Sequence, residues 1–180
     1  MLHEIIENNQ PVRIAFMLNE KEIIDIDLAT IDELHLPEFA EKKLSIDVLR
    51  LDKIHPIISG NKWFKLKYYL DDAVQQKRSI ITFGGAYSNH IIATAYAAKK
   101  LNVASIGIIR GEETKRLSHT LILAKEYGMK FELISRNEYF KKNDENFISA
   151  LQLTYPGSII IPEGGAGIKG IKGSEEIMKL

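Results

Sequence analysis

Short apolar runs alternate with longer amphipathic segments between residues 79 and 161. The runs are typical of strands buried on both faces, and the segments between them carry apolar stripes of helical period. The predicted strands cover 79–83, 104–109, 131–134 and 158–161, and the predicted helices run from Ser88 or Asn89 to Leu101, over 117–127 and over 145–153. This order indicates βαβ units and therefore an α/β fold, with a three-layer parallel sheet, flanking helices and right-handed crossovers.

The N-terminal part of the chain has a different pattern. Apolar residues alternate over 12–18 and again over 24–28, and the polar segment 19–22 separates the two stretches. Alternation on both sides of a polar break predicts a hairpin. Three further elements are predicted: a short strand at 48–52, a helix at 63–76 and a last helix that begins at Gly173.

The composition is that of a globular protein, with 180 residues of which 45% are apolar. The 24 basic residues balance the 24 acidic ones, so the charge pattern gives no support for binding to nucleic acid or to an anionic membrane. The chain contains no cysteine, and His3, His35 and His119 have no partners at ligand spacing. We therefore expect no metal site.

The chain has no pattern that predicts a membrane segment. No apolar run approaches the roughly 20 residues that a membrane-spanning helix needs. The N-terminus carries Glu4 early and lacks the basic and apolar regions of a signal peptide. We therefore expect a soluble, cytoplasmic protein.

Lys62 is the first candidate for chemistry, because it directly follows Ser59-Gly60-Asn61. A lysine that forms a Schiff base needs a lowered pKa or a neighbouring cofactor to keep its amine available, and the apolar neighbours Ile57, Ile58 and Trp63 make partial burial plausible. The alternative is an ordinary solvated lysine after a turn, and periodicity alone does not decide between the two.

The segment Gly84-Gly85-Ala86-Tyr87-Ser88-Asn89-His90 is the second candidate, because it joins a predicted strand to a predicted helix. Backbone N–H groups at a helix N-terminus favour a phosphate or carboxylate, and glycines let a ligand approach the backbone closely. Ser88 and Asn89 have a structural alternative as helix caps. The segment fits neither the dinucleotide fingerprint nor the Walker pattern, so a nucleotide-binding module is disfavoured.

A third segment, Pro162-Glu163-Gly164-Gly165-Ala166-Gly167, also follows a predicted strand. Ligands of open α/β sheets bind beyond the carboxyl ends of the strands, so this segment and Gly84–His90 are predicted to line one cleft. The alternative is a flexible connector to the residues that follow.

In this order, the three segments resemble the 1-aminocyclopropane-1-carboxylate deaminase and D-cysteine desulfhydrase family. The resemblance covers about residues 45–175 and includes the stretches 59–70, 84–90 and 161–165. Members of this family are pyridoxal-phosphate enzymes of the tryptophan-synthase-β fold (fold type II). The resemblance therefore implies deamination of a small amino acid, of the 1-aminocyclopropane-1-carboxylate or D-cysteine type, to a 2-oxo acid and ammonia.

The resemblance also implies a role for each motif residue. Lys62 would hold pyridoxal 5′-phosphate through its amine, and Asn61 would contact the cofactor. Asn89 would hydrogen-bond the ring hydroxyl of the cofactor and contribute to substrate binding. Ser88 would bind the substrate carboxylate and act as a nucleophile or proton relay. His90 stands where some members have glutamine, and it is predicted to contact the substrate.

Family members continue well beyond the point that matches Leu180, so the resemblance implies a chain truncated at its C-terminus. We expect residues 1–78 to form an N-terminal extension and the first part of the large cofactor domain. Residues 79–161 would form the small α/β domain, and 162–180 would return towards the large domain.

The expected truncation has consequences for partners and activity. We expect weak cofactor binding and little turnover by the isolated chain. Apolar surface is expected to be exposed at Val48, Leu49, Ile57, Ile168 and Ile171. The expected partners are a small amino acid as substrate and either a second copy or a complementary chain. The alternative function, from a different class, is an inactive fragment that associates with another chain.

Overall fold

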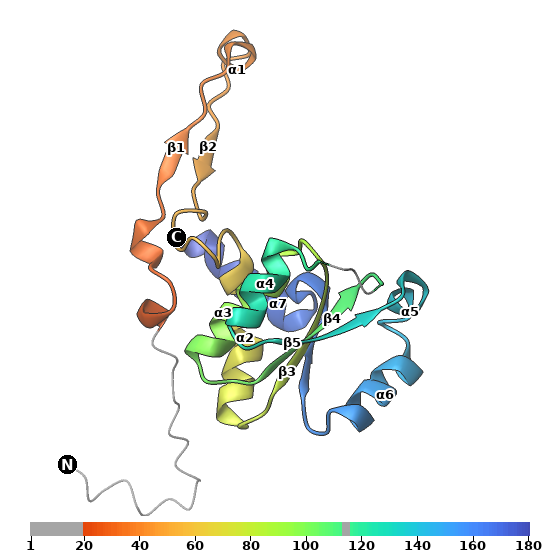
Figure 1. Cartoon of the computed structure of the whole chain (residues 1–180). Helices are drawn as coiled ribbons and strands as arrows, with labels where there is room; N and C mark the ends of the chain where they lie inside the picture. The colour runs from red at the N-terminus through yellow and green to blue at the C-terminus, as the bar shows by residue number, and fades with distance from the viewer. Residues whose placement is uncertain (1–19, 113–115) are drawn as a thin grey trace, which may run out of the picture.

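In the computed structural model, which describes residues 20–112 and 116–180, an α/β body carries a narrow hairpin arm (Figure 1). The body contains a sheet of four strands: β3 (Ile80–Gly85), β4 (Ser105–Arg110), β5 (Lys130–Ile134) and β6 (Ile159–Ile161). The strand order is β5-β4-β3-β6, and all three pairings are parallel. The parallel α/β sheet that the sequence predicts is confirmed.

Helices connect and flank the strands. They are α2 (Lys62–Gln75), α3 (Asn89–Lys100), α4 (His119–Glu126), α5 (Arg136–Phe140), α6 (Glu145–Thr154) and α7 (Ile168–Glu175). Short 3-10 helices lie at Glu20–Glu22, Ile26–Leu28, Glu163–Gly165 and Glu176–Lys179. The predicted helices at 63–76, 88–101, 117–127 and 145–153 correspond to α2, α3, α4 and α6, whereas α5 was not predicted.

Apolar side chains are buried on both faces of the sheet, because successive strand residues point to opposite faces. On one face Ile109 packs against Ile91 of α3. On the other face Phe83 packs against Tyr139 of α5, with the two rings edge to face. A third apolar cluster, centred on Trp63, joins α2 to α3, β3 and β6. This cluster contains residues from both sides of position 78, and the domain division at 78 and 161 remains a prediction.

A glycine on α7 lets this helix approach α2 closely. A Cβ atom at Gly173 would stand 1.7 Å from the backbone oxygen of Phe64, so no larger residue fits there without a backbone shift. The prediction that Gly173 opens this helix is wrong. The helix begins at Ile168, because Gly167 turns the chain with a φ of 95°, and Gly173 is instead an interior contact residue.

The hairpin arm consists of β1 (Ile31–Glu33), α1 (Pro37–Glu41) and β2 (Asp47–Leu49). Its two strands are antiparallel, with Ile31 opposite Leu49. The prediction of a strand at 24–28 is wrong, because the Asp25 side chain accepts a hydrogen bond from the N–H of Asp27 and stabilises a helical turn there. The other stretch of the predicted hairpin, 12–18, lies outside the described residues.

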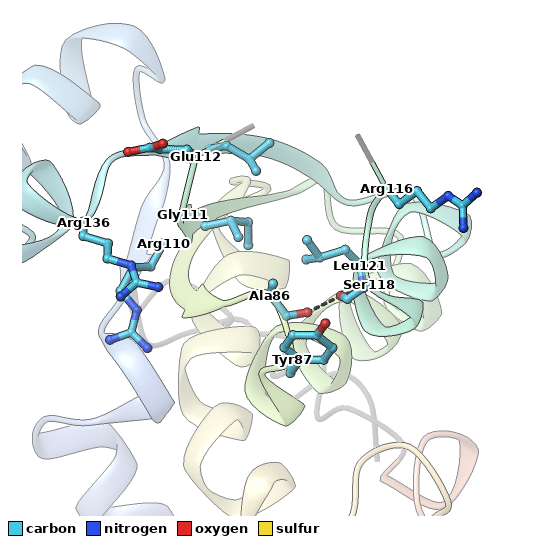
Figure 2. A pocket seen from close by; sticks show the side chains of 11 residues that line it. Ala86, Tyr87, Arg110, Gly111, Glu112, Arg116, Ser118, Leu121 and Arg136 are labelled. Carbon is cyan, nitrogen blue, oxygen red and sulfur yellow. Dashed lines mark hydrogen bonds between the residues drawn. The ribbon is translucent and has the colours of Figure 1, made fainter. Parts of the chain in front are cut away.

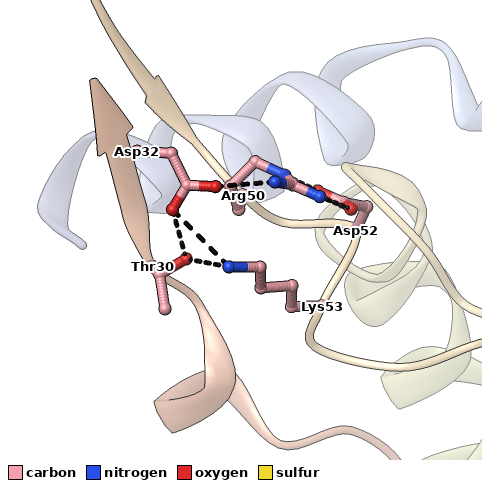
Figure 3. Close-up of polar contacts among 5 residues, drawn as sticks. All are labelled: Thr30, Asp32, Arg50, Asp52 and Lys53. Carbon is pink, nitrogen blue, oxygen red and sulfur yellow. Dashed lines mark hydrogen bonds and ion pairs between the residues drawn. The ribbon is translucent and has the colours of Figure 1, made fainter. Parts of the chain in front are cut away.

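A group of polar side chains holds the base of the arm (Figure 3). Arg50 donates to Asp32 at 2.6 Å, and a second guanidinium nitrogen donates to Asp52 at 2.7 Å. Lys53 donates to Thr30 at 2.7 Å and lies 3.5 Å from Asp32. These contacts connect β1 to the segment after β2 through charged groups that remain largely in contact with water.

Candidate functional site

Lys62 lies at the first position of α2, near the carboxyl end of the sheet. Its Nζ atom donates to Oδ1 of Asn61 at 3.1 Å, and its side chain is partly buried. Burial lowers the pKa of Lys62, and the charge of Lys65 lowers it further. A lowered pKa increases the fraction of free amine, which a lysine needs in order to act as a nucleophile. The partial burial inferred from the sequence is thus observed.

The turn before Lys62 is fixed by His55. Its Nδ1 atom accepts hydrogen bonds from the N–H groups of Ile57 and Ile58, each at 3.0 Å. Gly60 then adopts a φ of 66°, which favours glycine. This turn determines where α2 begins and therefore where the amine of Lys62 is presented.

The glycine-rich segment after β3 is built tightly around the start of α3. A Cβ atom at Gly84 would stand 2.5 Å from Cγ1 of Ile91, so this position requires glycine. Ser88 is the N-cap of α3, and its Oγ atom accepts a hydrogen bond from the N–H of Ile91 at 3.4 Å. The capping alternative for Ser88 is therefore observed. Because Oγ is the acceptor in this contact, its own proton remains available for a ligand. Asn89 follows as the exposed first residue of the helix.

His90 is 4% exposed, and its Nε2 atom lies 2.8 Å from Oγ1 of Thr82. The hydroxyl of Thr82 donates its single proton to the backbone oxygen of Ile161 at 3.1 Å. With that proton assigned to Ile161, Nε2 of His90 carries a proton and donates to Thr82. The Nδ1 atom then presents a lone pair, and it is buried with no hydrogen-bond partner in residues 20–112 and 116–180.

The charges around His90 bring three segments of the chain together. Burial lowers the pKa of His90 to about 4, the nearby charge of Lys62 contributes to this lowering, and Glu163 opposes it. His90 is therefore neutral at pH 7. The Glu163–Gly165 segment also contacts α2, α3 and β3, so the start of α2, the start of α3 and this segment meet at one edge of the sheet.

The Glu163–Gly165 segment is packed against its neighbours. Glu163 forms an ion pair with Lys142 at 3.3 Å. Gly165 has a φ of 72°, and a Cβ atom there would stand 2.9 Å from Cβ of Lys65. This structured arrangement differs from the flexible connector that was the alternative interpretation of residues 162–167. The segment places a carboxylate at the same edge as Lys62.

Some residues of this edge were not predicted as functional. Thr82 contacts Nε2 of His90, Arg110 lies beside Gly85 of the glycine-rich segment, and the ring of Tyr139 lies against Arg110. Burial raises the pKa of Tyr139, and Glu163 raises it further. Arg110 directly follows the predicted strand 104–109, so its place at the carboxyl edge is visible in the sequence, whereas its contact with Tyr139 depends on tertiary packing.

The residues at this edge fit a cofactor that carries an aldehyde and an anionic group. Lys62 supplies an amine whose pKa is lowered, and His90 supplies a buried acceptor atom that has no partner among the described residues. Ser88 supplies a free proton at a helix N-terminus, where backbone N–H groups attract anions. Within the described ranges, no group of three or more acidic or histidine side chains is arranged to hold a metal ion. No helix in those ranges is both long and apolar enough to cross a membrane.

Comparison with known proteins identifies relatives of one kind. No protein-family model matches the chain. A protein of Pyrococcus abyssi with the provisional name 1-aminocyclopropane-1-carboxylate deaminase is 33% identical over 144 residues, which are 77% of this chain and 43% of the relative. The mitochondrial bifunctional D-cysteine desulfhydrase/1-aminocyclopropane-1-carboxylate deaminase of Arabidopsis thaliana is 36% identical over 126 residues, which are 64% of this chain and 31% of the relative.

Solved structures agree with these matches. The crystal structure of a 1-aminocyclopropane-1-carboxylate deaminase homologue has a TM-score of 0.64 and 31% identity, and the match covers 81% of this chain and 45% of that one. A fungal L-serine ammonia-lyase from Rhizomucor miehei, 21% identical with a TM-score of 0.54 over 84% of this chain and 46% of its own, shares the fold. The resemblance inferred from the motifs, and the fold it implied, are confirmed. The chain spans less than half the length of each of these proteins.

Proposed function

From the resemblance to 1-aminocyclopropane-1-carboxylate deaminases and D-cysteine desulfhydrases, we propose that this chain forms part of a pyridoxal-phosphate enzyme that deaminates a small amino acid. The observation that carries the proposal is the convergence of Lys62, Ser88 and His90 at the carboxyl edge of the sheet. The products would be a 2-oxo acid and ammonia. Substrates of the 1-aminocyclopropane-1-carboxylate or D-cysteine type are proposed because these compounds are in the names of the relatives.

Each residue of the motifs has a proposed role. Lys62 holds the cofactor through Nζ, and Asn61 orients that amine through its side-chain oxygen. Asn89, exposed at the start of α3, hydrogen-bonds the cofactor and contributes to substrate binding. When bound, pyridoxal 5′-phosphate supplies an electron sink for the bond-breaking steps, and the protein supplies orientation and proton transfer.

Ser88 and His90 act on the substrate. The proton of Ser88 is not used in capping, so it is available to a substrate carboxylate or for relay to a reacting atom. His90 is neutral and offers its Nδ1 lone pair, so it accepts a proton in a hydrogen bond and adds no charge to the site.

A second copy or a complementary chain is the proposed partner, and the cytoplasm is the proposed location. Exposed apolar residues support an association: Ile168 is 86% exposed, Ile171 62% and Val48 39%. The inactive fragment that only associates with another chain is the second candidate function, and the same exposed residues favour it.

The test of the cofactor role uses the full chain with added pyridoxal 5′-phosphate. We expect a visible absorbance band from the lysine–cofactor adduct, and borohydride reduction followed by peptide mass mapping should locate the adduct at Lys62. Lys62→Ala should remove the band while the circular dichroism spectrum stays unchanged. Lys65→Ala is the matched control, because Lys65 lies on the same helix one turn further along.

The control variant should keep the band, and 2-oxo acid release from 1-aminocyclopropane-1-carboxylate and D-cysteine then tests turnover. An adduct that persists in Lys62→Ala, or one that maps equally to several lysines, contradicts the assignment. A band at Lys62 without 2-oxo acid release from this chain or from its complex with a partner supports the second candidate.

A further inference from the structure

A pocket of about 490 Å³ opens next to the glycine-rich segment, on the β4 and β5 side of the sheet (Figure 2). Its walls come from the end of β4, the end of β5 and the start of α4. The hydroxyl of Ser118 donates to the backbone oxygen of Ala86 and so joins α4 to the glycine-rich segment at the pocket wall. The pocket lies beyond carboxyl ends of parallel strands, where ligands of such sheets bind.

The charge of the pocket wall is positive. Arg110, Arg116 and Arg136 line it, with Glu112 as the acidic residue of the lining. In Figure 2, the side chains of Arg110 and Arg136 extend to the same side of the pocket, whereas Arg116 extends away from them. Neither Arg110 nor Arg136 forms an ion pair with a carboxylate of the described residues. Two guanidinium groups on the wall of one pocket, neither of them ion-paired within the described residues, attract an anion.

Two neighbours fix the position of Arg110. Its guanidinium lies over the ring of Tyr139, 5.6 Å from the ring centre, and Tyr139 is buried. A guanidinium nitrogen stands 3.6 Å from the place where a Cβ atom would lie on Gly85. Since stacking restrains the guanidinium, less entropy is lost when it binds a ligand.

The backbone at Arg136 is also held in place. It is the first residue of α5, directly after Ser135, whose side chain caps the helix in a reciprocal pair with Glu138. The Ser135 hydroxyl donates to Glu138 at 2.8 Å, so that carboxylate is engaged at the cap. The backbone of Arg136 is therefore held by the capping pair while its side chain reaches the pocket.

Arg110 and Ser88 flank the end of β3 from opposite faces. The Oγ atom of Ser88 stands 2.9 Å from the place of a Cβ atom on Gly84, and Arg110 covers Gly85. Consecutive strand residues point to opposite faces, so a ligand lying across this strand end can contact both groups. One carboxylate at Ser88 and a second anionic group at Arg110 would lie on one small molecule.

We propose that Arg110 and Arg136 form a subsite for a carboxylate on the side chain of the amino-acid substrate. This inference rests on the proposed deaminase function and goes beyond it, because it adds amino acids with an acidic side chain to the 1-aminocyclopropane-1-carboxylate and D-cysteine types, which have no side-chain carboxylate. A guanidinium binds a carboxylate through two parallel hydrogen bonds, and an amide of the same shape cannot replace that charge. The subsite therefore selects aspartate-like over asparagine-like ligands.

The test is a titration of the full chain without cofactor, followed by ¹H–¹⁵N NMR at low ionic strength. The ligands are both enantiomers of aspartate, both enantiomers of asparagine, and inorganic phosphate. We expect one enantiomer of aspartate to bind at least roughly tenfold more tightly than the matching asparagine. Arg110→Gln and Arg136→Gln should each remove this preference, whereas Arg116→Gln, which lines the same pocket but is directed away from the other two arginines, should keep it.

Equal binding of aspartate and asparagine, or an aspartate preference that survives in both glutamine variants, overturns the subsite. Phosphate binding that depends on Arg110 and Arg136 without any aspartate preference overturns its assignment to the substrate side chain. The titration uses no cofactor, so its result is independent of Lys62. An aspartate preference in an unsubstituted chain that forms no cofactor adduct at Lys62 would show that the proposed function fails while the subsite stands.

Discussion

The hairpin arm and the α/β body contain similar apolar side chains but are stabilised in different ways. In the body, Leu66 and Leu70 have no exposed surface. In the arm, Ile31 is 65% exposed and Leu44 is 55% exposed. A sheet covered by helices gives each apolar side chain a second layer to pack against, whereas a two-stranded hairpin gives none. An apolar residue therefore stabilises this protein only where a second layer exists.

The arm depends on charged contacts instead. Arg50 holds Asp32 and Asp52 at the base of the arm, and Lys53 reaches back to Thr30 (Figure 3). Such contacts are specific in geometry but weak in water, because solvent screens the charges and long side chains lose entropy. The body is therefore stabilised by burial of apolar side chains, and the arm by charged hydrogen bonds at its base. The two regions should respond differently to substitution, pH and salt.

The largest expected effect comes from one matched pair of leucine substitutions. Leu70→Ala should lower the free energy of unfolding by about 2–5 kcal/mol, because it leaves a cavity in the packed body. Leu44→Ala in the arm should change it by less than about 0.5 kcal/mol. Urea unfolding followed by circular dichroism measures both. Equal losses would mean that Leu44 is buried in solution, for instance against another chain.

A second effect distinguishes the body by its response to pH. The folded pKa of His90, about 4, lies below the value of about 6.5 for the unfolded chain. The unfolded state therefore binds more protons between these values, so stability is full above pH 6.5 and falls as the pH drops towards 4. The loss is on the order of 3 kcal/mol.

The measurement is the pH dependence of unfolding for the unsubstituted chain minus that of His90→Gln, which cancels the contributions of other groups. ¹⁵N chemical shifts of the imidazole should also show a proton on Nε2 at pH 7. A proton on Nδ1, or identical pH profiles for the two proteins, would disprove the tautomer argument.

The smallest effect concerns the arm alone. Arg50→Met should remove hydrogen-exchange protection from β1 and β2 while the melting temperature of the body stays nearly constant. The same loss is expected in the unsubstituted chain at low pH. Arg50 lowers the pKa of Asp52 to about 2 and also lowers that of Asp32. The stabilisation is therefore present above about pH 4 and is lost as the pH falls towards 2.

Residue-resolved exchange at pH 6 and pH 3, with and without added salt, tests this prediction. Arg50→Lys is the control, because it keeps the charge and loses the two-pronged geometry. Protection that survives in Arg50→Met would show that the β1–β2 pairing does not depend on the ion pairs.

The sequence was most informative where local chemistry and tertiary packing agree. The strand that ends at Gly84-Gly85 and the helix capped by Ser88 follow from apolar runs and a capping residue, and both are present. α5 was missed although Ser135 and Glu138 have the spacing of a capping box, which is a signal that the sequence contains. Alternation over 24–28 predicts a strand, but the side chain of Asp25 accepts a hydrogen bond from the N–H of Asp27 and stabilises a helical turn instead.

The sequence predicted individual residues of the candidate site but not the side-chain contacts between distant segments. Lys62 and Ser88 each belong to a short motif of neighbouring residues, so the sequence alone identifies them. The tautomer of His90 depends on which acceptor Thr82 uses, and that acceptor, the backbone oxygen of Ile161, is 79 residues away along the chain. Similarly, the position of Arg110 depends on the ring of Tyr139. Neither contact has a local signature, because both arise only when the strands align.

The order of the strands has a consequence for how the chain is assembled. β3 pairs with β4 through Ile80 and Ser105, but with β6 through Ile80 and Ile159. Closing the longer loop costs about 1 kcal/mol more in chain entropy. During synthesis, the partner on one side of β3 is available long before the partner on the other side. Chain entropy thus favours late addition of β6, and with it the carboxylate of Glu163, to the edge where Lys62 lies.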